Sequence, residues 1–329
     1  MVVCARVVPA MRAQTPASHA GTRADFDQLM KELSNWGRWG KDDQMGAVNL
    51  ITPAKRKAAL ATVKEGFSVS MARRAETEQA VDNPRPILRV MEGAGRGARA
   101  GTPPAAPPDI SGASDTLTIS YHGSVHTHMD SFCHRAYKGL MYNGMPMTSV
   151  DDNGCNMGSI YAWRDGIMTR AVLMDMPRLK GVDYLEPGTP IYPEDLDAWV
   201  KKAHIKIEPG DVILIRTGRW AARQAKGPYN TNQFAGLYMT SAKWLHQHDA
   251  AILGSDAAED VHPSGIDGIT EPVHALVLIA MGMPIFDNLD LEAVSREAAK
   301  RNRWEFLVTA APMPYPGATG SPLNPIATF

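Results

Sequence analysis

Residues 120–134 read SYHGSVHTHMDSFCH and place four of the ten histidines of the chain within thirteen consecutive positions. Side chains of a strand alternate between its two faces, so residues of equal parity share one face. In an extended chain, that face would carry His126, His128 and Asp130, with His122 and His134 of the same parity. Such a row has few structural uses, because in a core each polar group would need its own hydrogen-bond partner.

A divalent metal ion would satisfy this donor set. Neutral imidazole nitrogens and carboxylate oxygens are ligands of Zn²⁺, Mn²⁺ and Fe²⁺. The alternative is a chance cluster of histidines that are hydrogen-bonded separately, in the core or on the surface. The spacing His-x-His-x-Asp, followed by a further histidine four residues on, favours the metal site.

The segments around this stretch predict an α/β fold. Residues 116–121 alternate as a strand that leads into the histidines, and strands alternate with helical patterns through the second half of the chain. Further strands are expected at 67–71, 171–174, 212–216, 250–254, 284–286 and 305–309, and helices at 26–33, 53–64, 194–203, 241–248, 271–281 and 291–300.

The 329 residues are interpreted as one domain, residues 25–329, with two irregular parts. Residues 1–24 carry three arginines and no acidic residue, and we expect a flexible leader; a processed secretory segment is the alternative, although charges and a proline interrupt its apolar run. Residues 82–114 are crowded with proline and glycine and predict a long surface excursion.

Composition excludes several classes of partner. With 34 basic and 35 acidic residues the net charge is −1, which gives no field to attract nucleic acid. No apolar run approaches the ~18–20 residues that span a bilayer, so no membrane partner is expected. Three cysteines are too few for a disulfide framework, which favours a reducing, cytoplasmic location; a periplasmic or secreted protein is the alternative tied to the leader.

The histidine stretch resembles the metal-binding signature H-x-G-T-H-x-D-x-P-x-H of the cyclase family, which includes bacterial kynurenine formamidase, isatin hydrolase and lactone hydrolases. Segments across residues 30–315 resemble the longer members of this family; they are 35–43, 46–53, 208–218, 254–256 and 282–290, together with His274. The resemblance implies a swivelling β/β/α-type fold with a mixed β-sheet core packed by helices. It also implies a homodimer or homotetramer.

The resemblance assigns roles residue by residue. His128 and Asp130 match metal ligands, and His134 matches the histidine that acts as acid and base. Downstream, His274 matches a histidine near the metal, and Asp287 is the plausible replacement for an acidic or amide residue expected one position earlier, where the chain has a phenylalanine. We expect one divalent ion, Zn²⁺ or Mn²⁺, with a second ion conceivable.

The chain departs from the signature at three positions. Ser124 stands for its first histidine, His126 for its glycine and Phe132 for its proline. Loss of the first histidine weakens the case for a second ion unless His122 or His126 substitutes for it. His126, Phe132 and Trp39 are candidates for the substrate pocket.

Two further segments are ambiguous. Residues 259–262, Glu-Asp-Val-His, resemble a small ligand set but are interpreted as solvated surface loop. Ser255-Asp256 fits either a ligand site at the end of a strand or the cap of a following turn.

Together, these features predict a metal-dependent hydrolase that opens an amide or ester carbonyl of a lactone, a cyclic amide or an aryl-formamide. Water activated by the metal would attack, with His134 moving the proton. A cyclase or dehydratase that uses the same metal is one alternative, and a non-catalytic metal- or ligand-binding protein is another.

Overall fold

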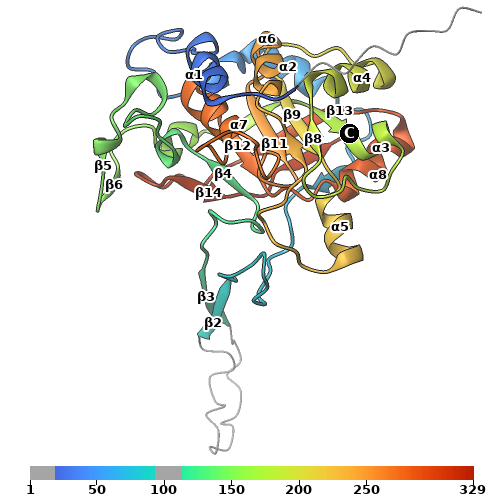
Figure 1. Cartoon of the computed structure of the whole chain (residues 1–329). Helices are drawn as coiled ribbons and strands as arrows, with labels where there is room; N and C mark the ends of the chain where they lie inside the picture. Colours follow the sequence, from blue (N-terminus) through green and yellow to red (C-terminus); the bar gives the residue numbers. More distant parts are fainter. Residues whose placement is uncertain (1–18, 93–112) are drawn as a thin grey trace, which may run out of the picture.

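A nine-stranded mixed sheet forms the centre of the computed structural model, which describes residues 19–92 and 113–329 (Figure 1). The four strands in the middle of the sheet are parallel, and the strands outside them pair antiparallel. In spatial order they are β1 (Ser68–Ser70), β15 (Ile326–Thr328), β13 (Glu305–Ala310), β7 (Ile167–Asp175), β9 (Val212–Arg216), β11 (Ile252–Ser255), β12 (Ile285–Asp287), β4 (His128–Asp130) and β14 (Gly320–Pro322).

The parallel strands are the core of the molecule. All five residues of β9 and all four of β11 are buried, and their sequences VILIR and ILGS do not alternate between apolar and polar. Such runs are typical of parallel strands that are covered on both faces. The predicted α/β class and the mixed sheet packed by helices are therefore confirmed.

Helices surround the sheet and begin at recognisable signals. The Thr52 side chain accepts a hydrogen bond from the Lys55 backbone N–H, and Pro53 starts the helix that packs on β7. The helices are α1 (Arg23–Glu32), α2 (Pro53–Leu60), α3 (Met176–Lys180), α4 (Pro193–Ala203), α5 (Arg219–Lys226), α6 (Ser241–Gln247), α7 (Pro272–Ala275) and α8 (Glu292–Arg301). The helix expected at 271–281 is instead α7 followed by a π-helical turn, Leu276–Ala280.

In the described parts of the chain, three short two-stranded units lie outside the main sheet. One pairs β2 (Leu88–Glu92) with β3 (Ser114–Thr118), and this hairpin stands away from the body of the molecule (Figure 1). Its first strand falls within the excursion predicted at 82–114, so that segment contains regular structure that its prolines and glycines did not indicate. The others pair β5 (Val150–Asp151) with β6 (Gly154–Cys155) and β8 (Pro190–Ile191) with β10 (Gly236–Leu237).

The described residues change two other expectations. Helix α1 begins at Arg23, capped by Thr22, so regular structure begins within the segment expected as a flexible leader. Residues 1–18 of that leader and residues 93–112 of the excursion lie outside the described residues. Cys133 and Cys155 form a disulfide. Disulfides are typical of oxidising compartments, so this pairing does not support the reducing location predicted from the cysteine count.

No helix in the described parts of the chain has the length and apolar character needed to cross a bilayer.

Gly282 forms the turn between the π-helical segment and β12. Its φ of +60° lies in the left-handed region, and its carbonyl accepts the Ala47 N–H at 2.7 Å. A Cβ at this position would lie 2.3 Å from Cε2 of the buried Tyr142.

We therefore expect Gly282→Ala to lower the free energy of unfolding by about 2 kcal/mol or more, because strain and overlap add. Gly139→Ala is the matched control: Gly139 has a φ of +79° with nothing within 4 Å of the added Cβ, so only the backbone cost of about 1 kcal/mol should appear. Urea denaturation measures both variants. Equal losses would show that overlap with Tyr142 contributes nothing.

Candidate metal centre

The pairing of β4 with β12 brings the first ligands together. In this register His128 lies directly opposite Asp287, and residues opposite one another on adjacent strands point to the same side. His128 Nε2 is 3.5 Å from Asp287 Oδ2 and 3.2 Å from Asp130 Oδ1. Two side chains from β4 and one from β12 thus meet in a fully buried group.

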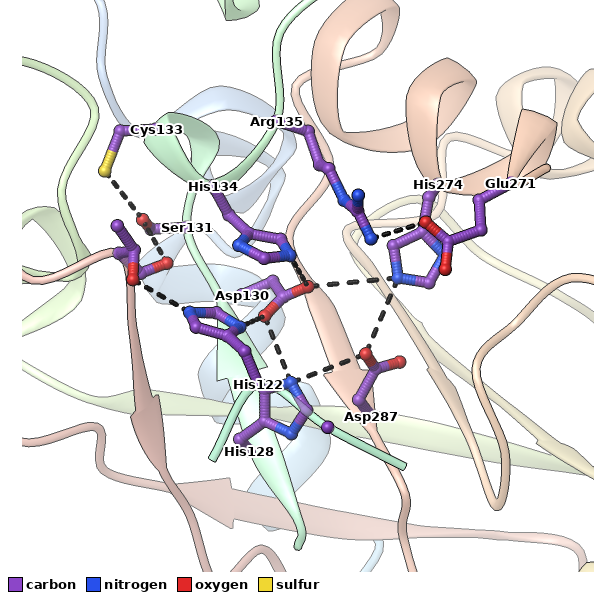
Figure 2. A network of polar contacts seen from close by, with 12 residues as sticks. His122, His128, Asp130, Ser131, Cys133, His134, Arg135, Glu271, His274 and Asp287 are labelled. Carbon is purple, nitrogen blue, oxygen red and sulfur yellow. Dashed lines mark hydrogen bonds and ion pairs between the residues drawn. The ribbon is translucent and has the colours of Figure 1, made fainter. Parts of the chain in front are cut away.

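His274 reaches this group from α7. Its Nε2 is 3.5 Å from Asp287 Oδ2 and 3.9 Å from Asp130 Oδ2, and it is 2% exposed (Figure 2). Asp260 fixes its position, because one carboxylate oxygen accepts both the backbone N–H and the Nδ1–H of His274. The other oxygen accepts the Val273 N–H, so the same carboxylate caps the short helix.

His122 and His134 complete the cluster on its other side. His122 Nδ1 is 3.0 Å from Asp130 Oδ1, and His134 Nε2 is 3.6 Å from Asp130 Oδ2. Their rings stack with centroids 3.9 Å apart and planes 4° from parallel (Figure 2). His122 therefore lies where a ligand is needed although Ser124 replaces the first histidine of the signature.

The imidazoles are oriented by their outer nitrogens. His128 Nδ1 is 2.8 Å from the His126 carbonyl, His274 Nδ1 binds Asp260, and His122 Nε2 is 2.8 Å from Thr319 Oγ1. Each ring thereby turns its other nitrogen toward the carboxylates. This arrangement is typical of metal-binding histidines, whose outer hydrogen bonds fix the tautomer and the ring orientation.

Glu259 is a member of the cluster that the sequence analysis placed on the surface. It is 1% exposed, and its Oε2 is 3.6 Å from His274 Nε2. Asp260 is fully buried, so the interpretation of 259–260 as solvated loop was wrong. The segment follows β11, and ligands in α/β sheets gather beyond the carboxyl ends of parallel strands; that position was the available signal.

Asp256, in contrast, has a structural role. Its carboxylate accepts hydrogen bonds from the backbone N–H groups of Thr217, Gly218 and Arg219 at the start of α5. Asp256 therefore caps α5, which precedes it in the chain, rather than the following turn that the sequence suggested; at that turn Ser255 Oγ accepts the Ala257 N–H.

The donor set fits a divalent cation. Both oxygens of Asp130, both of Glu259 and Oδ1 of Asp287 are buried and accept no hydrogen bond from any described residue. Among the described residues the nearby donors of these three buried carboxylates are imidazole nitrogens, so the carboxylates would be costly while those rings are neutral, whereas a cation would neutralise them. Three groups have ligand atoms within 4.8 Å of one another: His122–Asp130–His134, His128–Asp130–Asp287 and Glu259–His274–Asp287. Because Asp130 and Asp287 each belong to two groups, the set can hold one ion or two adjacent ions.

Titration behaviour follows from burial and from these charges. Burial alone would lower the pKa of His128, but Asp130 and Asp287 outweigh it and raise the pKa to about 9. Burial lowers the pKa of His134 to about 3. Burial and the nearby Asp287 raise the pKa of the Glu259 carboxyl well above its usual range. The metal-free cluster therefore favours protons on His128, His274 and Glu259, while His134 is neutral at pH 7.

The cluster lies at the base of a cavity of about 930 Å³. Four of the histidines, His122, His128, His134 and His274, line it together with Asp287. The remainder of the wall is formed largely by residues 262–271 and by Thr231, Asn232 and Phe234.

The three residues expected in the substrate pocket lie elsewhere. His126 is 7% exposed, and its ring Nε2 is 3.5 Å from the Arg85 carbonyl. Phe132 is fully buried against Tyr142 and Trp163. Trp39 is half-buried beneath the Arg38 guanidinium. The structure brings together His128, Asp130, His134, His274 and Asp287 as predicted, and adds His122 and Glu259.

Comparisons with known proteins agree with this architecture. Residues 48–259 match the family described as "Putative cyclase". A crystal structure of a novel cyclase superposes with a TM-score of 0.79 at 32% identity, covering 91% of this chain and 99% of that chain. The chain therefore belongs to the cyclase family.

More distant structures share the fold. Isatin hydrolase A from Labrenzia aggregata, bound to benzyl benzoate, superposes with a TM-score of 0.54 at 17% identity over 82% of this chain and 94% of that chain. Isatin hydrolase A from Ralstonia solanacearum gives a TM-score of 0.50 at 17% identity with the same coverage. No curated protein matches the chain at a significant level.

We expect Asp130→Ala to abolish binding of divalent metal, because the Asp130 carboxylate belongs to two of the three donor groups. Glu259→Gln should weaken binding and, if two ions bind, remove one of them. His126→Gln is the control, since His126 lies outside the donor groups. Elemental analysis after dialysis against Zn²⁺ measures bound metal per chain; unchanged metal in Asp130→Ala would refute the centre.

The pKa of His128 also predicts the stability of metal-free protein. Because the folded-state pKa is about 9, above the usual value of 6.5, this imidazolium contributes stability that is fully present below about pH 6.5 and is lost as pH rises through 9. We expect the free energy of unfolding to fall by about 2–3 kcal/mol over this window. His128→Gln should lack this component. Chemical denaturation of chelator-treated protein at several pH values measures the slope, and identical slopes in the two proteins would contradict the assignment.

Proposed function

We propose that this member of the cyclase family is a metal-dependent hydrolase that opens an amide or ester carbonyl in a small cyclic or aryl-linked substrate. The observation that carries the proposal is the set of buried carboxylate oxygens without hydrogen-bond donors at the base of a large cavity. Without a metal ion, the burial of these carboxylates would cost free energy. With a bound cation, the same residues would form a reactive centre that is open to the cavity.

His128, Asp130 and Asp287 would hold the ion. A second ion could be held on one side by His274 and Glu259, or on the other side by His122. Zn²⁺ or Mn²⁺ suits these nitrogen and oxygen donors. A divalent ion bound there would lower the pKa of coordinated water and polarise a substrate carbonyl.

His134 is the proposed acid and base. It lines the cavity, and burial lowers its pKa to about 3, so the imidazole is neutral at pH 7 and is the form that a general base requires. The stacked ring of His122 and the Asp130 carboxylate restrict its orientation. A proton taken from the attacking water could then be delivered to the leaving nitrogen or oxygen.

The cavity supports a substrate with an apolar body. Phe234, Ile266 and Ile269 line it together with the polar cluster, so a ring could lie against them while its carbonyl faces the donors. Lactones, cyclic amides and aryl-formamides share this combination. The benzyl benzoate bound to the Labrenzia isatin hydrolase is an ester that carries two aromatic rings, which is consistent with this class.

A cyclase or dehydratase that uses the same centre is the second candidate, favoured by the description of the family. Product analysis separates the two: hydrolysis consumes water and releases an acid, whereas ring closure does not. A panel of an aryl-formamide, a lactone and a cyclic imide, followed by pH-stat titration of metal-loaded protein, tests the first candidate. We further propose a homodimer or homotetramer. A cytoplasmic location stays a prediction from the cysteine count, and the Cys133–Cys155 disulfide does not support it.

For His134→Ala we expect full metal content and a turnover rate lower by about 10²-fold or more, since removal of an acid/base group typically has this effect. Metal analysis and turnover on the best substrate of the panel are measured on the same preparation. Loss of metal together with activity would instead make His134 a ligand, as the His122–Asp130–His134 group allows. Full activity would remove it from the reaction.

A further inference from the structure

Arg135 follows the proposed acid/base directly and lines the same cavity. Among the described residues that form the cavity wall it is the only lysine or arginine. Its side chain is 40% exposed, and Figure 2 shows its guanidinium turned toward Glu271. A permanent positive charge therefore lies beside the metal centre without being part of it.

Only some of the N–H donors of the Arg135 guanidinium have partners among the described residues. Nη2 forms an ion pair with Glu271, whereas Nε is buried and has no hydrogen-bond partner among the described residues. A guanidinium has five N–H donors arranged to bind a carboxylate with two parallel hydrogen bonds. Nη1 has no polar partner among the described residues, so its donors remain available to a ligand in the cavity, whereas the buried Nε is not accessible to one.

Glu271 is a counter-ion that a ligand could replace. Its side chain is 23% exposed and lines the cavity, and partly exposed ion pairs of this kind are weak. Its carboxylate accepts no hydrogen bond that caps α7; only its backbone carbonyl serves the helix, through the Ala275 N–H. Exchange of Glu271 for another carboxylate would leave the local fold intact.

We propose that Arg135 is a specificity-determining residue that binds a carboxylate on the substrate, with Glu271 occupying the guanidinium when the cavity is empty. The inference rests on the proposed function, because the substrate whose carboxylate binds Arg135 would place its carbonyl at the metal centre. It narrows the substrate class to small anionic molecules with a ring that can pack on the apolar wall formed by Phe234 and Ile266.

A purely structural role makes a different prediction. The Arg135–Glu271 pair also joins the chain segments that carry His134 and His274, so it could act only as a strut between them. Loss of either partner would then impair the site in the same direction. In ligand recognition, the two losses act in opposite directions, because Glu271 competes with the ligand for Arg135.

The test is calorimetric titration of metal-loaded protein with benzoate, an aryl carboxylate, and with acetohydroxamate, a metal-binding ligand that is uncharged in neutral solution. We expect Arg135→Met to weaken benzoate binding by about 10- to 100-fold, the effect of losing charge-assisted hydrogen bonds. Arg135→Lys should lie between, since an ammonium lacks the planar fork. Glu271→Gln should bind benzoate more tightly than the wild type, and acetohydroxamate binding should be the same in all four proteins.

Weaker benzoate binding in both Arg135→Met and Glu271→Gln, or no change in either, would overturn the inference. Failure of acetohydroxamate to bind the wild type would count against the metal centre and hence the proposed function, while the opposite responses of the two variants to benzoate would still decide the role of Arg135.

Discussion

Three carboxylates, those of Asp130, Glu259 and Asp287, are buried within one small cluster, and compensation of their charge is the constraint on which the site depends. In the metal-free protein, bound protons compensate part of this negative charge, because the pKa values of His128 and Glu259 are raised. A divalent cation would compensate the same charge with fewer bound protons. Outer hydrogen bonds turn the rings of His122, His128 and His274 toward the carboxylates in advance, so little reorganisation is needed when an ion binds.

The sheet explains why these side chains converge. Asp287 is the last residue of β12, and Glu259 follows the parallel neighbour β11 by four residues, so both carboxylates lie beyond the carboxyl ends of parallel strands. β4 then runs antiparallel along β12, which places His128 opposite Asp287. Residues more than 100 positions apart thus reach one point through strand pairing alone, and α7 needs only one buried carboxylate, Asp260, to hold His274 there.

Local patterns in the sequence predicted only part of this arrangement. His128 and Asp130 point to the same face, as their equal parity predicted, because both belong to β4. β4 is only three residues long, and a 3₁₀ turn follows it, so His134 reaches the cluster from that turn. His126 precedes the strand and does not reach the cluster. Glu259 was missed because its burial depends on contacts with distant segments that no local pattern encodes. The sequence suggested that His122 could substitute for the first histidine of the signature, whose position is occupied by Ser124. The stacking of the His122 ring on the His134 ring could not be predicted without coordinates.

Charge balance connects the cluster with Arg135. With neutral imidazoles, the three carboxylates give −3; one divalent ion leaves −1, and two leave +1. A single ion therefore leaves the base of the cavity unfavourable to an approaching carboxylate, and Arg135 then supplies the only fixed positive charge among the described residues of the wall. Two ions would attract the anion themselves and make Arg135 less important for affinity, although it would still orient the ligand through its fork of donors. The dependence of anion binding on Arg135 is consequently coupled to the number of ions that Asp130 and Asp287 share.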